Sequence, residues 1–191
     1  MAVRALAVHK RKKLQEYQHL MNEAQIEGIG KGDNNALERL YKSTVRAVYA
    51  YILSIIRNPA DTPRLVEETY LWVRKSAHLY TPTGKPLAWI FSIASKLAQD
   101  YCQPYAGKAE KGNKMDVEPS LEQISTRLDR VVFRCALRVL SSEERQVLFL
   151  YTMAGLRCWE ISTNLSLNTL TVYIRYRISI YKVTKHLQKR G

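Results

Sequence analysis

Two neighbouring stretches with helical periodicity, separated by a short loop rich in proline and glycine, constrain the fold of this chain most. In the first stretch, residues 65–80, the apolar side chains are spaced to form one broad helical face made of Leu65, Val66, Thr69, Leu71 and Val73. In the second stretch, residues 87–101, apolar side chains recur at three- and four-residue steps, namely Leu87, Ile90, Ile93, Ala94, Leu97, Ala98 and Tyr101. Pro86 suits the first turn of a helix, because its missing N–H would have no partner there. We therefore predict two helices that face each other across the loop.

The charge balance predicts an anionic partner. Thirty Lys and Arg residues against 17 Asp and Glu residues give a net charge of +13 and a pI near 9.8. For a helical protein the usual partner of such a chain is nucleic acid, with an anionic membrane surface as the second choice. We expect no membrane insertion, since no apolar run is long enough to span a bilayer, and the order of residues 2–13, apolar then basic, is the reverse of a secretory signal.

The sequence carries no pattern of catalytic, cofactor-binding or metal-binding residues. The cysteines Cys102, Cys135 and Cys158 are odd in number and far apart, which favours neither a disulfide framework nor a zinc site and is typical of a reducing cytoplasm. The four histidines are scattered and there is no phosphate-binding loop. We expect a cytoplasmic protein without cofactor or metal that is not an enzyme.

The remaining sequence divides into helical stretches and one polar segment. Residues 33–58 have helical periodicity behind Asp33 or Asn34, either of which is a natural N-cap. Residues 104–127 are polar and interrupted by glycine and proline, as in a flexible linker. We therefore predict an all-α protein with two small helical domains, at 28–103 and 128–191, joined by a flexible linker at 104–127 and preceded by a basic N-terminal extension at 1–27.

The C-terminal part has the pattern of a helix-turn-helix. A capping box at Ser141–Glu144 starts one helix at residue 142, and two further helices, at 157–164 and from 168 to about 185, are joined by a three-residue turn. In the last helix Val172, Tyr176, Ser179, Ile180 and Val183 have core spacing. In a helix-turn-helix the second helix enters the major groove, and the side chains expected to face DNA are Asn168, Thr169, Thr171, Tyr173, Ile174, Arg175 and Arg177. The two arginines suit guanine, which would specify sequence, or phosphate, which would only position the protein.

Both halves of the chain resemble bacterial RNA polymerase sigma factors of the extracytoplasmic-function (ECF) group. The family's region two pairs a D-x-x-D-L-V-Q-E-T-F helix with an F-x-x-W-L-Y-R-I-A-R-N-x-x-x-D-Y helix, and this chain matches it at Leu65, Val66, Glu68, Thr69, Trp89, Ile93, Ala94, Asp100 and Tyr101. The family's region four is matched at Leu140, Arg145, Val147, Leu150, Gly155, Leu156, Glu160, Ile161, Leu165, Thr171, Val172 and Arg175. The resemblance covers nearly all of the chain beyond its N-terminal extension.

This resemblance implies partners and site residues. It implies that core RNA polymerase binds the first helix at Leu65, Val66, Glu67 and Glu68, that the second helix faces the melted strands of promoter DNA, and that an anti-sigma protein can be a further partner. For strand opening it implies Trp89, Phe91 and Lys96, together with Lys85 in the loop that would hold an extruded base. A core position for Trp89 is an equally good interpretation.

Departures from the family pattern keep two alternatives open. Pro63 and Arg64 replace acidic residues on the expected polymerase-binding helix, and Lys96 takes the place of the usual base-reading asparagine. Ser166 stands at the turn glycine, and Tyr173 follows the T-V pair where the family has a basic residue. The first alternative is a helix-turn-helix regulator that has lost polymerase binding, and the second is a nucleic-acid-processing enzyme.

Overall fold

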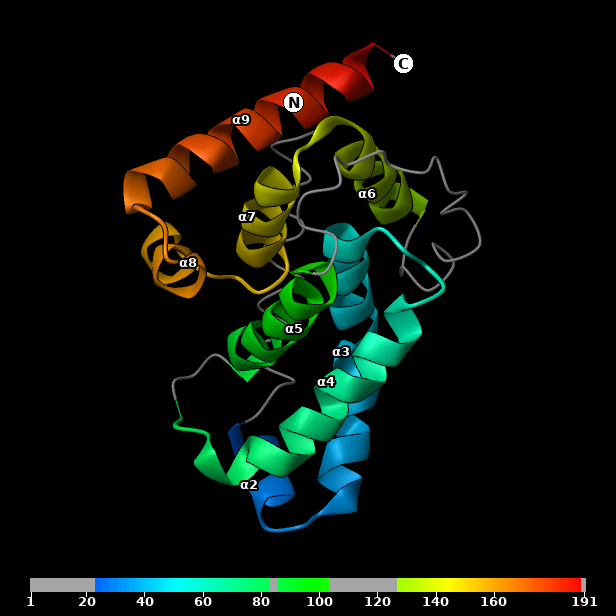
Figure 1. The fold of residues 1–191 in the computed structure, drawn as a ribbon, viewed down its shortest axis with the longest axis vertical. Helices are drawn as coiled ribbons and strands as arrows, with labels where there is room; N and C mark the ends of the chain where they lie inside the picture. The colour runs from blue at the N-terminus through cyan, green and yellow to red at the C-terminus, as the bar shows by residue number, and fades with distance from the viewer. Residues whose placement is uncertain (1–22, 83–85, 104–126, 190–191) are drawn as a thin grey trace. The chain divides into compact units, whose positions relative to one another are not determined.

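The computed structural model describes residues 23–82, 86–103 and 127–189, which form α-helices and one short 3-10 helix (Figure 1). The elements are α2 (Glu23–Gly30), α3 (Asn34–Ile56), α4 (Thr62–Ser76), η1 (Ala77–Leu79), α5 (Pro86–Cys102), α6 (Arg127–Val139), α7 (Ser142–Thr152), α8 (Cys158–Leu165) and α9 (Thr169–Gln188). The first four helices form one compact group and the last four a second. The prediction of an all-α protein with two helical groups is confirmed, while the linker and most of the N-terminal extension lie outside the described residues.

The N-terminal group is built on three helices, α3, α4 and α5, that pack against one another. Its core consists of fully buried apolar side chains, among them Leu40, Val48, Ile52, Leu53, Val73, Ile90 and Phe91. Two polar contacts tie the helices together: the hydroxyl groups of Thr44 and Tyr70 lie 2.6 Å apart, and the Tyr101 hydroxyl donates to the Asp61 carboxylate at 2.7 Å. The predicted pair of helices on either side of the loop is confirmed, and the second begins at Pro86 as expected.

Helix α4 buries a narrower face than its sequence pattern suggested. Leu71, which we expected on the apolar face, is 64% exposed, and Trp72 beside it is 49% exposed. The reason is the step of about 100° per residue along an α-helix: a face centred on Leu65, Thr69 and Val73 leaves Leu71 on the opposite side. An apolar surface on α4 therefore remains uncovered by the described residues.

Two of the residues that depart from the family pattern, Pro63 and Arg64, fit the start of α4. Pro63 lies in the first turn of the helix, where a missing N–H costs nothing. Arg64 forms an ion pair with Glu68 one turn later, at 2.5 Å. The departures therefore leave the helix intact and neutralise one of its carboxylates.

Helix α2 contains two glycines. Gly28 and Gly30 lie inside this helix, whose Ile26 and Ile29 are buried. A Cβ atom at Gly28 would lie 3.2 Å from the Ala36 side chain, and one at Gly30 would lie 3.3 Å from the backbone of His78. These glycines permit close packing of α2 against α3 and η1.

The C-terminal group packs α6, α7 and α8 against α9. The predicted capping box is confirmed: the Ser141 hydroxyl accepts from the Glu144 N–H, and the Glu144 carboxylate accepts from the Ser141 N–H at 2.9 Å. The rings of Phe133 and Phe149 meet with centroids 5.3 Å apart. Arg145 is buried, and its guanidinium donates to the Leu140 carbonyl at 2.6 Å.

The turn between α8 and α9 places a serine in a backbone conformation that favours glycine. Ser166 has φ 53° and ψ 41°, the left-handed region, which crowds the Cβ atom of an L-residue. Replacing Ser166 with glycine is expected to raise the free energy of unfolding of the C-terminal group by about 0.5–1 kcal/mol. The substitution relieves backbone strain in the folded state, and the greater conformational entropy of glycine in the unfolded state offsets part of this gain. Denaturant unfolding of the full chain measures this difference. Ser166→Ala is the control, because it keeps the Cβ atom and should give no gain.

Candidate nucleic-acid interface

Helices α8 and α9 form the predicted helix-turn-helix, joined by Ser166, Leu167 and Asn168. The Asn168 side chain caps α9 by accepting from the Leu170 N–H at 2.8 Å. The Thr169 hydroxyl donates to the Ser162 hydroxyl on α8 at 3.0 Å. Two of the residues expected at DNA, Asn168 and Thr169, therefore also fix the start of α9 and the geometry of the turn.

The inner side of α9 follows the predicted core spacing. Val172, Ser179 and Val183 are buried, whereas Tyr176 and Ile180 are only partly covered. The Ser179 hydroxyl donates to the Glu144 backbone carbonyl at 3.2 Å and so ties α9 to the first turn of α7. The packing of these residues fixes which side of α9 points outward.

The outward side of α9 is more apolar than we predicted. Of the expected DNA-facing residues, Tyr173, Ile174 and Arg177 are exposed, while Thr171 and Arg175 are partly buried. Three exposed residues were missed: Leu170, Ile178 and Tyr181. The available signal was helical projection, since all three lie across the helix from Val172 and Val183, but their apolar character suggested packing.

The two arginines expected to act together lie in different environments. The Arg175 guanidinium pairs with the Glu143 carboxylate on α7 at 2.7 Å, and its side chain is only 25% exposed. Arg177 is exposed and forms no ion pair within the described residues. Arg177 is therefore the more available of the two for a phosphate or a base.

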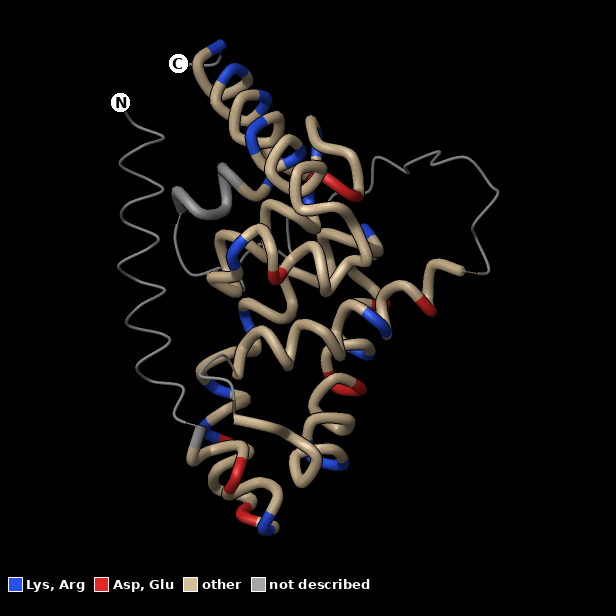
Figure 2. Tube along the Cα trace, turned by 90° about the vertical axis from the view of Figure 1, so that its left-hand side faces the viewer, with Lys and Arg blue, Asp and Glu red and all other residues tan. Residues whose placement is uncertain are grey.

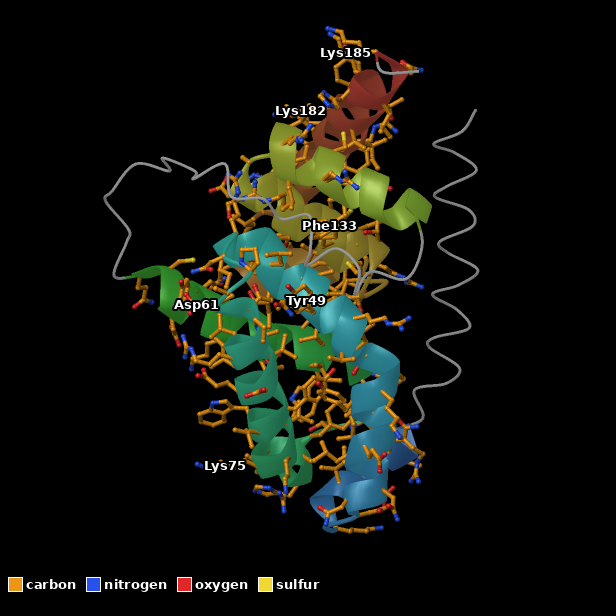
Figure 3. The ribbon with its side chains drawn as sticks, turned by 90° about the vertical axis from the view of Figure 1, so that its right-hand side faces the viewer. Tyr49, Asp61, Lys75, Phe133, Lys182 and Lys185 are labelled. Carbon is orange, nitrogen blue, oxygen red and sulfur yellow. The ribbon has the colours of Figure 1, made fainter. Side chains whose placement is uncertain are left out.

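Positive charge is concentrated on α9. The helix contains no acidic residue, and it carries Arg175, Arg177, Lys182 and Lys185 along its length (Figure 2). Figure 3 labels Lys182 and Lys185 on this helix; Lys182 reaches Glu144 at 2.7 Å, whereas Lys185 is exposed and lies 5.5 Å from the centre of the Tyr181 ring. An exposed helix of this composition is suited to a polyanion.

Lowering the pH is expected to weaken the C-terminal group through Glu144. Partial burial, the largest single effect, raises the pKa of this carboxyl, but hydrogen bonds from Lys182 and Ser141 and the Lys182 charge together lower it below the ordinary 4.5. A carboxyl with a lowered folded-state pKa stabilises the fold above its unfolded-state pKa, and that contribution is lost as the pH falls through the folded-state value. Because Lys182 is 42% exposed, the contribution is below about 1 kcal/mol.

Unfolding free energies measured between about pH 6 and about pH 3 test this linkage. The Glu144→Gln and Lys182→Met variants should each lose part of the pH dependence of the original chain. Identical pH profiles in all three proteins would contradict the assignment.

The residues expected to bind polymerase on α4 divide into buried and exposed ones. Leu65 and Val66, which we expected at the polymerase interface, are buried in the helical core. Glu67 is exposed, and Glu68 is engaged by Arg64. The outward side of α4 includes Glu67, Leu71, Trp72 and Lys75, besides the exposed Arg64 and Arg74. The Lys75 ammonium group lies 5.2 Å from the Trp72 ring centre, and Figure 3 labels Lys75 on the outer side of this helix.

The residues expected to act in strand opening are also divided. Phe91, which we expected to act in strand opening, is fully buried, and its ring stacks on that of Tyr51 with the centroids 4.7 Å apart. Trp89 is partly exposed, with its ring 5.0 Å from that of Tyr80, and Lys96 is exposed. Lys85 lies outside the described residues.

The described ranges contain neither a cluster of metal ligands nor a helix that could span a membrane. No three His, Cys, Asp or Glu side chains there are grouped to hold a metal ion. No helix in the same ranges combines the length and apolar character that crossing a bilayer requires.

Comparisons with known proteins find relatives by sequence and by fold. No family model matches the chain. The ECF RNA polymerase sigma factor SigK of Mycobacterium sp. (strain JLS) is 27% identical over 161 residues, which cover 80% of this chain and 83% of that protein. SigK of Mycobacterium ulcerans (strain Agy99) is 26% identical over 163 residues, which cover 81% of this chain and 87% of that protein.

The fold has a counterpart among solved structures. The structure of CnrH in complex with the cytosolic domain of CnrY matches with a TM-score of 0.58 and 18% identity, over 89% of this chain and 99% of that one. Sequence similarity to SigK thus extends through both helical groups, and the likeness to CnrH extends the agreement to the fold. The predicted resemblance is confirmed: the chain is similar to RNA polymerase sigma factors of the ECF group over about 80% of its length.

Proposed function

We propose that this chain binds core RNA polymerase and directs promoter recognition, strand opening and transcription initiation. Similarity to ECF sigma factors supports the proposal, and the observation that carries it is the helix-turn-helix whose second helix is exposed, basic and free of acidic residues. The sigma factor family is not enzymatic, which removes the nucleic-acid-processing enzyme from the alternatives. Since transcription takes place in the bacterial cytoplasm, we place the protein there.

The polymerase-binding surface that we propose is the outer face of α4, defined by Glu67, Leu71 and Trp72. It lies on the helix that the family resemblance assigns to this role, and it combines an exposed carboxylate with exposed apolar side chains. Exposed apolar clusters of this kind mark protein–protein interfaces, in which tryptophan often contributes most. Buried Leu65 and Val66 support this surface from within the core.

For strand opening we propose Trp89 and Lys96 of α5. The Trp89 ring is partly exposed beside Tyr80, so it retains a face on which an unpaired base can stack. Exposed Lys96 offers a cation for the strand's phosphates. The resemblance also assigns Lys85 to this site.

An anti-sigma protein is the further partner that we propose. The similar protein CnrH was solved in complex with the cytosolic domain of CnrY. A partner of that kind would regulate this chain by covering surfaces that it needs for polymerase or promoter DNA.

Transcription in vitro with core RNA polymerase over a pool of genomic fragments tests the proposed function. The full chain should produce discrete transcripts that are absent with core enzyme alone. A chain that binds particular duplexes but neither binds core enzyme nor starts transcripts would be a helix-turn-helix regulator without polymerase docking.

A further inference from the structure

The outer side of α9 combines apolar side chains with positive charge. Leu170, Tyr173, Ile174, Ile178 and Tyr181 are all exposed large hydrophobic residues, and Leu170 is 65% exposed. Among them lies exposed Arg177, and Lys185 follows at the C-terminal end. In this group of helices, one face of α9 packs on the core while the opposite face presents a second apolar stripe.

Charge decides which occupant fits this stripe. The helix has no acidic residue, and its N-terminus carries the partial positive charge of the helix dipole without a first-turn carboxylate to offset it. Duplex DNA presents phosphates on both sides of a groove wide enough to admit an α-helix. The basic residues suit the phosphates, and the apolar ones then face the base edges.

The major groove offers one apolar group, the 5-methyl group of thymine, which side chains recognise by direct contact. Guanine is instead recognised by the paired hydrogen-bond donors of an arginine. Arg175, the arginine that the sequence pattern favoured for this, is held by Glu143 at 2.7 Å. The side chains left free near the N-terminal end of α9 are thus mainly apolar.

We propose that α9 reads promoter DNA through thymine methyl groups, with Leu170 and Ile174 as the specificity residues and Arg177 as a phosphate contact. This rests on the proposed function, since it requires that α9 enters the major groove.

Deoxyuridine provides the sharpest test, because it lacks only the thymine methyl group and keeps every hydrogen-bonding atom. Duplexes are first selected from a random 20-base-pair pool by the full chain, alone and bound to core RNA polymerase. Each thymine of the selected sequence is then replaced singly by deoxyuridine. At the positions that are read, affinity should fall about fourfold per methyl group, which corresponds to ~0.8 kcal/mol.

Variants connect the methyl groups to the side chains. In Ile174→Ala or Leu170→Ala the thymine probe should bind more weakly, and deoxyuridine at the matching position should cause no further loss. Arg177→Ala should weaken thymine and deoxyuridine probes alike and reduce the salt dependence of binding by about one unit. Leu79→Ala is the matched control, because Leu79 is similarly exposed, at 72%, and lies in the N-terminal group; it should leave both probes unchanged.

The outcomes separate this inference from the proposed function. Selected duplexes that tolerate deoxyuridine everywhere, or that contain no fixed thymine, would overturn methyl readout while leaving promoter binding intact. Selective duplex binding that is unaffected by Ile174→Ala and Leu170→Ala would also overturn methyl readout. The exposed apolar side of α9 would then be a binding surface for another protein. Failure of the full chain to select any duplex, with or without polymerase, would refute the proposed function and this inference with it.

Discussion

Replacing Phe91 with alanine is expected to lower the free energy of unfolding of the N-terminal group by about 3–5 kcal/mol. The ring is fully buried and stacks almost parallel on Tyr51, at an interplanar angle of 4°. Its removal takes away apolar contacts and leaves a cavity that rigid helices on either side fill only in part. Burial also raises the pKa of Tyr51 to about 12, so this partner is a neutral phenol at physiological pH. A loss of that size is a large share of the stability of a small domain.

Denaturant unfolding of the full chain, followed by circular dichroism, measures this loss. Trp89→Ala is the matched control on the same helix, since Trp89 is only partly buried and its removal should cost less stability. If Trp89 stacks on an unpaired base, its variant should instead impair strand opening at unchanged fold. If Phe91→Ala has normal stability but fails to open promoter DNA, Phe91 contacts DNA and does not stabilise the core.

Features encoded by neighbouring residues could be predicted from the sequence. The capping box at Ser141, the start of α5 at Pro86 and the cap of α3 at Asp33 each depend on side chains within one helical turn of the backbone they satisfy. The division into two helical groups was predicted from helix starts and caps of the same kind. Local chemistry therefore accounts for the element boundaries that were predicted correctly.

Features that depend on residues far apart in the chain could not be predicted in this way. Glycine is a poor helix former, and only the close approach of Ala36 and His78 explains why Gly28 and Gly30 lie in α2. The pairing of Arg175 with Glu143 joins two helices, so the sequence of α9 alone made Arg175 and Arg177 look equivalent. The sequence of α5 alone does not show whether Phe91 is exposed or buried, because its burial depends on packing against Tyr51 of α3.

Replacing Leu71 and Trp72 together with alanine is expected to weaken binding to core RNA polymerase by about 30-fold or more, the effect of losing one tryptophan hot spot worth about 2 kcal/mol. Both side chains are exposed, and they lie on the outer face of α4 beside Glu67. Their removal takes nothing from the core, so thermal unfolding should change little. Affinity measured by titration of labelled full chain with core enzyme gives the result.

A second arm tests the charge on the same face. Glu67→Lys should weaken core binding, whereas Glu68→Lys should do so less, because Arg64 already neutralises Glu68 at 2.5 Å. Leu170→Ala matches Leu71 in chemistry and exposure but lies on α9; it should affect DNA binding and leave core affinity unchanged. The double variant at Leu71 and Trp72 should show the opposite pattern. Full core affinity in that variant would mean that polymerase does not bind the outer face of α4, and the proposed docking surface would have to move to another part of the chain.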